Sequence, residues 1–148
     1  MAGRPGERPP PPAGHRLLPH TADVMIEAWG ATREDCLAEA ARALTACFVD
    51  TSAVSATTTV PVVFAATGEE DLLVQVLDEA IFLLDAQGVV VVDAQLERCE
   101  DGGLRGSFRT APAGAVTLTG SVPKGVALHG LSVRRRAGGW TCRFTVDV

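Results

Sequence analysis

The chain has 148 residues, 47% of them hydrophobic and 21% charged, which is enough apolar material for one core. The formal net charge of −5 and the pI near 5.1 argue against a protein that binds nucleic acid over its whole surface, because phosphate binding requires clustered positive charge. Any contact with RNA is therefore expected to be local or indirect.

The N-terminal residues are rich in proline, glycine and arginine and cannot supply a core-facing pattern. We expect a disordered or extended tail over residues 1–14 and a single domain over residues 15–148. The start of the chain lacks the apolar segment of a secretion signal, and no apolar run is long enough to span a membrane. The cysteines form no short-spaced pair, which indicates small buried thiols of a reduced, cytoplasmic compartment. They are Cys36, Cys47, Cys99 and Cys142.

Two helices are predicted from their start signals and apolar spacing. Thr32 stands in an N-cap position before acidic residues, and the helix that follows should end near Asp50. Residues 68–71 repeat the acidic start, and a broad apolar stripe runs from there to Gly88, which should end the second helix.

The remaining segments read as strands. A short edge strand is predicted over residues 16–18, and alternating side chains predict a half-buried strand over residues 24–30. β-branched residues favour a strand over residues 57–67, which Pro61 restricts to an edge or a bulge. A hairpin is predicted around the turn at residues 100–103. Three further strand candidates cover residues 115–122, 126–133 and 140–148.

The order is strand, helix, strand, helix and then a run of closely connected strands. Such short connections leave no room for helical crossovers and favour antiparallel pairing. We therefore predict an α+β fold, a two-layer sandwich with two helices on one face of a largely antiparallel mixed sheet.

The common catalytic signatures are missing, including a phosphate loop, a GxSxG elbow and an HExxH helix. Asp23 at the mouth of a strand could ligate a metal, act as a base or cap a turn. Asp147 and the carboxylate of Val148 add hard oxygen donors, which suit calcium, magnesium or manganese. Lys124 is the only lysine, and it is either a solvated charge or a contact to phosphate or a partner.

Several motifs together resemble the archease family, and the likeness covers nearly everything after Arg16. They are the box His20-Thr21-Ala22-Asp23-Val24, the strand ending in Trp29-Gly30, the Thr32-led helix, the Asp71-Leu72-Leu73 start of the second helix and the terminal Val146-Asp147-Val148.

The resemblance implies an accessory factor of an RtcB-type RNA ligase, not an enzyme in its own right. Family members promote guanylylation and repeated turnover of a ligase that uses GTP and a divalent metal in tRNA splicing or RNA repair. It implies Asp23, Asp147 and Val148 as metal ligands. Lys124 and His129 match the family's basic strand and would contact phosphate or the partner. His20 would support Asp23 or only cap the turn.

Two rival functions stay open from the residues alone. The same carboxylates could serve a stand-alone metal-dependent phosphoesterase, although a general base or nucleophile is not evident. A plain protein-interaction module would leave the aspartates dispensable. The triplet at residues 134–136 is interpreted as a solvated hairpin tip, with contact to RNA or the ligase as its alternative.

Overall fold

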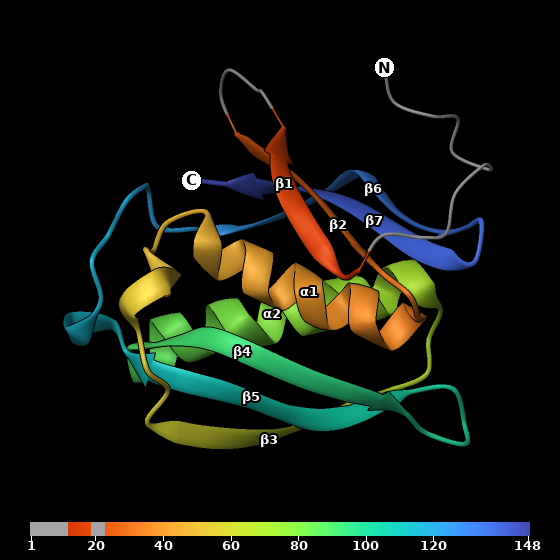
Figure 1. Cartoon of the computed structure of the whole chain (residues 1–148), viewed down its shortest axis with the longest axis horizontal. Coiled ribbons are helices and arrows are strands. Elements are labelled where there is room, and N and C mark those ends of the chain that lie inside the picture. Colours follow the sequence, from red (N-terminus) through yellow and green to blue (C-terminus); the bar gives the residue numbers. More distant parts are fainter. Residues whose placement is uncertain (1–11, 19–22) are drawn as a thin grey trace.

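The computed structural model describes residues 12–18 and 23–148. Figure 1 shows a helix pair lying between two sheets, one above it and one below it. The helices are α1 (Arg33–Ala46) and α2 (Glu69–Gln87). The strands are β1 (Gly14–Leu18), β2 (Val24–Gly30), β3 (Thr58–Phe64), β4 (Val89–Arg98), β5 (Leu104–Pro112), β6 (Gly125–Arg136) and β7 (Gly139–Asp147).

The α+β class is confirmed, but the strands form two sheets where we expected one. The first sheet has the order β1-β2-β7-β6 and the second the order β3-β5-β4. Every pairing between the described strands is antiparallel. Helix α1 contacts strands of both sheets, chiefly β2 and β4, and α2 contacts β6 and β4. The division depends on pairing between distant segments, such as β2 with β7, which local patterns do not encode.

Local signals placed the helix ends well. The Thr32 hydroxyl accepts a hydrogen bond from the backbone N–H of Asp35 at 3.0 Å, as an N-cap does. Gly88 ends α2 with φ of 64°, a left-handed conformation that favours glycine. Helix α1 stops at Ala46, earlier than expected, and Asp50 lies beyond it, where it caps a short 3-10 turn (Thr51–Ala53) by accepting from the N–H of Ser52.

One strand prediction is wrong. Residues 115–122 form no strand, and the segment makes only a single bridge, between Leu118 and Val49. Backbone hydrogen bonds on either side of that bridge join Thr117 to Asp50 and Thr119 to Phe48, and then the pairing ends. The β-branched composition of the segment therefore reflects a connection that touches the end of α1 briefly, not a member of a sheet.

One large core connects both sheets through the helices, beside a smaller buried cluster. Its largest fully buried side chains include Ile26 and Phe144 from the first sheet, Leu37 and Leu77 from the helices, and Phe108 from the second sheet. Both edge-strand predictions are confirmed, since β1 and β3 lie at sheet edges. Pro61 in β3 lacks a backbone donor, which an edge position tolerates.

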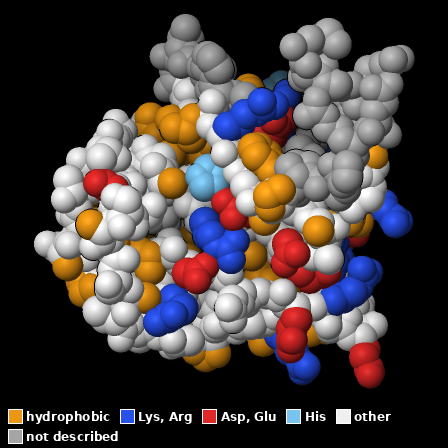
Figure 2. All heavy atoms as spheres, viewed as in Figure 1, with side chains coloured by type: hydrophobic (Ala, Val, Ile, Leu, Met, Phe, Trp, Pro, Cys, Tyr) orange, Lys and Arg blue, Asp and Glu red, His pale blue; other side chains and the backbone are white. Residues whose placement is uncertain are grey.

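Charged side chains of both signs gather over α1 and β4 in Figure 2. Arg42 of α1 donates from Nε to Asp93 Oδ1 at 2.6 Å, from Nη1 to Glu39 Oε1 at 2.9 Å and from Nη2 to the carbonyl of Ala94 at 2.6 Å. Glu39 also contacts His15 of β1. Burial raises the pKa of Glu39, but the bonds from His15 and Arg42 outweigh it and hold the pKa below its ordinary value. The network ties α1 to one strand of each sheet.

Replacing Arg42 with alanine should therefore lower the free energy of unfolding by about 2 kcal/mol, because Glu39 and the Ala94 carbonyl lose a charged donor. Urea unfolding measures the change. Arg105→Ala is the matched control, because the Arg105–Glu97 pair is exposed to solvent and should contribute much less than the Arg42 network. Equal losses in the two variants would contradict a structural role for the Arg42 network.

Candidate functional site

Two aspartates from distant parts of the sequence lie at the same end of the first sheet. Asp23 directly precedes β2, and Asp147 is the last residue of β7. The two strands run antiparallel with Val24 paired to Val146, so continuing the register by one residue sets Asp23 opposite Asp147. Figure 1 shows the end of β7 near the start of β2. Asp147 is exposed and Asp23 half-buried, so both carboxylates lie at a surface.

The sheet brings Lys124 to the same end. The backbone N–H of Lys124 donates to the carbonyl of Asp147 at 2.7 Å, and the next residue, Gly125, pairs with Asp147. The Lys124 side chain is exposed. Val148 follows Asp147 and packs its side chain against the core, which holds the last peptide of β7 in place. Asp23, Asp147 and Lys124 therefore lie at the same end of three adjacent strands, β2, β7 and β6.

His129 lies elsewhere on β6. The pairing of β6 with β7 jumps from Ala127–Thr145 to Ser132–Arg143, and His129 is in the bulge between them. The bulge is exposed at His129 and turns at Gly130, whose φ is 75°. His129 is thus separated from the strand end that holds Lys124 and Asp147. The other histidine prediction, His20, lies outside the described residues.

The donor set at the strand end fits a hard divalent cation that is shared with another ligand. Within residues 12–18 and 23–148, no three His, Cys, Asp or Glu side chains lie close enough to hold a metal by themselves. Asp23 and Asp147 offer two carboxylates, and proteins commonly hold Mg²⁺ with one or two carboxylates plus the phosphates of a substrate. Metal binding by these residues and by the Val148 carboxylate stays a prediction.

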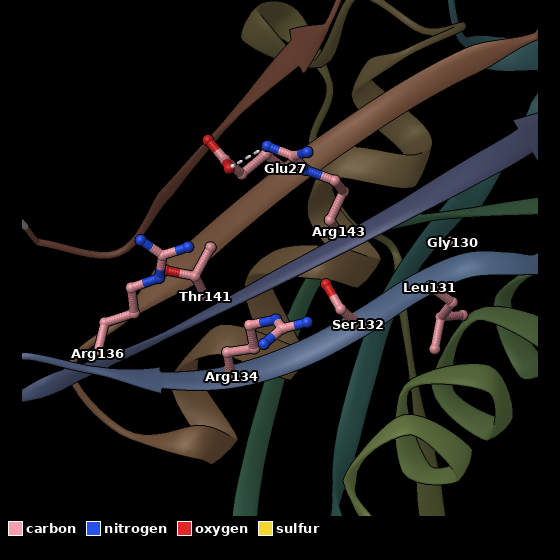
Figure 3. Close-up of a pocket in the computed structure, with 8 residues that line it drawn as sticks. All are labelled: Glu27, Gly130, Leu131, Ser132, Arg134, Arg136, Thr141 and Arg143. Atoms are coloured by element: carbon pink, nitrogen blue, oxygen red, sulfur yellow. Dashed lines mark hydrogen bonds and ion pairs between the residues drawn. The ribbon is translucent and has the colours of Figure 1, made fainter.

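A second feature, on the outer face of the same sheet, was missed by the sequence reasoning. A groove of about 340 Å³ crosses β2, β7 and β6 (Figure 3). The triplet at residues 134–136 is part of β6, so its interpretation as a hairpin tip is wrong. Eight residues line the groove, namely Glu27, Gly130, Leu131, Ser132, Arg134, Arg136, Thr141 and Arg143. Arginine at every second position of a strand was the available signal, since alternate residues share a face.

Glu27 lies at one side of the groove between two arginines. It accepts from Arg16 Nε at 2.7 Å and from Arg143 Nη2 at 3.2 Å. Burial raises the pKa of Glu27, but the hydrogen bonds and charges of Arg16 and Arg143 outweigh it and hold the pKa below its ordinary value of 4.5. Glu27 is therefore ionised at neutral pH and its charge is balanced within the protein.

This depressed pKa makes part of the stability pH-dependent. Because the pKa is lower in the folded chain, the contribution is complete above about pH 5 and is lost as the pH falls through the folded value. Glu27→Gln should lower the free energy of unfolding by about 1 kcal/mol at about pH 7 and by much less at about pH 3. Urea titrations at both pH values measure the difference. A constant gap between variant and parent would contradict the ionic account.

All four cysteines are free thiols, as the sequence indicated. Cys36 and Cys142 are buried, and Cys47 and Cys99 are half-buried. Burial raises the pKa of Cys47 to about 11, so this thiol carries almost no reactive thiolate at neutral pH. Among the described helices, none has the length and apolar character to cross a membrane.

These features define a small α+β protein with a helix pair between two antiparallel sheets and a carboxylate pair at one strand end. The sequence profile described as "Archease protein family (MTH1598/TM1083)" matches residues 15–148. The chain belongs to the archease family, as its motifs suggested.

Relatives agree with this assignment. The chain is 41% identical over 148 residues to a probable archease of Mycobacterium tuberculosis, covering 100% of this chain and 80% of that protein. It is 31% identical to the archease of Pyrobaculum neutrophilum, covering 93% and 97%. The solution structure of Methanobacterium thermoautotrophicum protein 1598 superposes with a TM-score of 0.69 at 22% identity, covering 91% and 99%. An archease from Thermotoga maritima, described as a possible chaperone, gives 0.62 at 20% identity, covering 90% and 96%. These two structures support the fold.

Proposed function

We propose that this protein is a metal-binding activator of an RtcB-type RNA ligase, and not an enzyme in its own right. The observation that carries the proposal is the pair of aspartates at one end of the first sheet, with the only lysine of the sequence directly before the neighbouring strand β6. Membership of the archease family supports it, because the motifs that resemble the family contain these same residues. The activity would serve tRNA splicing or RNA repair.

The residues have separate roles in this proposal. Asp23 and Asp147 hold a divalent cation, magnesium, manganese or calcium, at an exposed edge where a partner's nucleotide can approach. The cation would offset negative charge on transferring phosphoryl oxygens during guanylylation of the ligase by GTP. Lys124 contacts a phosphate or an acidic residue of the ligase. His20 orients the Asp23 carboxylate, and His129 contacts the partner from the β6 bulge.

The two aspartates lie at the ends of paired strands, which suits this role. Val24 and Val146 are paired on the core side of β2 and β7, and Val146 is fully buried. The backbone bond from Lys124 to Asp147 fixes the third strand against them. Sites built on strands are positioned more precisely than sites built on loops, so the ends of paired strands favour a defined arrangement of the two carboxylates.

The direct test mixes the cognate ligase with an excess of RNA ends, GTP and metal, and counts ligations per ligase molecule. Ligase alone should stall after few turnovers, and adding this protein should restore repeated turnover. An unchanged turnover number would overturn the activator function. Hydrolysis of a phosphoester by the purified protein without ligase would also overturn it, in favour of a stand-alone phosphoesterase.

A further inference from the structure

The groove on the outer face of the first sheet is open to solvent and built on paired strands. The helices pack on the opposite face, where Ile26, Phe144 and Val146 are buried. Ser132 and Arg134 of β6 pair with Arg143 and Thr141 of β7. Figure 3 shows these side chains rising from adjacent strands on the same side of the sheet. The volume of the groove, about 340 Å³, is in the range of ligand-binding sites.

The charge of the groove is opposite to that of the protein. Its lining holds three arginines and one carboxylate, whereas the chain as a whole has a net charge of −5. The carboxylate of Glu27 is balanced by Arg143 and by Arg16 from β1. Within the part of the chain that the structure describes, no carboxylate forms an ion pair with Arg134 or Arg136. Two guanidinium groups are therefore available for an external anion.

The remaining lining residues favour phosphate over a protein surface. Ser132 and Thr141 add hydroxyl groups, and planar guanidinium groups bind phosphate oxygens in pairs. Aromatic side chains are typical anchors of protein interfaces and of base-stacking sites, and none of the described residues that line the groove is aromatic. Leu131 is the one large apolar residue in the lining, and its side chain packs against the core.

We propose that this groove binds the phosphate backbone of single-stranded RNA without reading its bases. Arg134 and Arg136 are two residues apart on one strand and so project on the same side, where they contact neighbouring phosphates of a strand lying across the sheet. A contact confined to this arginine-lined groove is compatible with the acidic net charge of the protein. The choice of RNA over DNA rests on the proposed function, but binding itself requires no ligase.

The test is a titration of the isolated, isotope-labelled protein with an oligouridylate of about ten nucleotides, followed by NMR at low salt. Resonances of Ser132, Arg134, Arg136, Thr141 and Arg143 should shift. With two arginine–phosphate contacts, the plot of log affinity against log salt should have a slope of about −1.4, at about −0.7 per contact. Shifts confined to other surfaces, or a slope near zero, would overturn the proposal.

Variants that should weaken binding and a variant that should strengthen it test the same groove. The double variant Arg134→Gln/Arg136→Gln should bind about 25-fold more weakly at about 0.1 M salt, since each lost contact costs about fivefold. Arg135→Gln is the matched control, because Arg135 is on the same strand but does not line the groove, and its affinity should stay within about twofold of the parent. Glu27→Gln removes the one carboxylate among the described lining residues and should strengthen binding. An equal loss in the Arg135 variant would show that overall charge, not the groove, holds the strand.

Two further ligands distinguish a nucleic-acid backbone from a free nucleotide as the phosphate group that the groove binds. Oligodeoxythymidylate should bind similarly, because the contacts are to the backbone, whereas GTP alone should bind much more weakly than the oligomer. GTP binding as tight as the oligomer would replace the strand site with a nucleotide site. Because these measurements contain no ligase, their failure leaves the activator function standing, and a failed turnover assay leaves the groove standing.

Discussion

Asp147→Ala should abolish stimulation of the ligase, and Asp23→Ala should do the same. Each change removes one of the two carboxylates that the strand register sets opposite each other. Changes in residues that only orient metal ligands typically cost 10-fold to 100-fold in affinity, so loss of a ligand should cost about 100-fold or more. Turnover of the cognate ligase at fixed metal concentration measures the effect, and titration with Mn²⁺ measures the affinity separately.

Two further variants make this result specific. Asp147→Asn keeps an oxygen donor but loses the charge, so it should retain part of the stimulation at raised metal concentration. Asp85→Ala removes an exposed aspartate on α2 and should have no effect. The Asp147 and Asp85 variants should unfold at nearly the same temperature as the parent, because both side chains are exposed. Full stimulation by both alanine variants of the site would reject metal binding by this pair.

The sequence predicted the features that local chemistry determines. Thr32 begins α1 through its side chain, and Gly88 ends α2 through its left-handed backbone conformation. The turn at residues 100–103 joins β4 to β5 directly. The strand assignment over residues 115–122 failed because β-branched composition does not reveal whether a partner strand exists. The two sheets were not predictable for the same reason, since their membership depends on contacts between distant segments.

Of the two candidate sites, the aspartate pair was predicted from the sequence and the groove was not. Asp23 and Asp147 were selected by family motifs at opposite ends of the domain, and the register of β2 with β7 gives that selection a spatial basis. The groove forms only where β2, β7 and β6 lie side by side, so the sequence around Glu27 or Arg143 alone did not predict it. Arg134 and Arg136 were noticed as charges, but their orientation depended on the length of β6.

Phe108→Ala should cause the largest loss of stability, about 4 kcal/mol, through lost burial and the cavity left behind. Phe108 is fully buried on β5, the central strand of the second sheet. The centroid of its ring lies 6.1 Å from the centroid of the Phe64 ring. For a chain of this length the unfolding temperature should fall by about 12 °C. Val63→Ala, at a side chain that is 78% exposed, should change the stability by less than about 0.5 kcal/mol.

The same variant tests whether the two sheets share one cooperative core. Both tryptophans, Trp29 and Trp140, are in the first sheet, so their fluorescence reports on β2 and β7, whereas Phe108 is in the second. Because the helices pack against both sheets, the tryptophan signal and circular dichroism should move to the same lower temperature in Phe108→Ala. A tryptophan transition that stayed at the parent's temperature would show that the first sheet, with the carboxylate pair and the groove, is stable without the second.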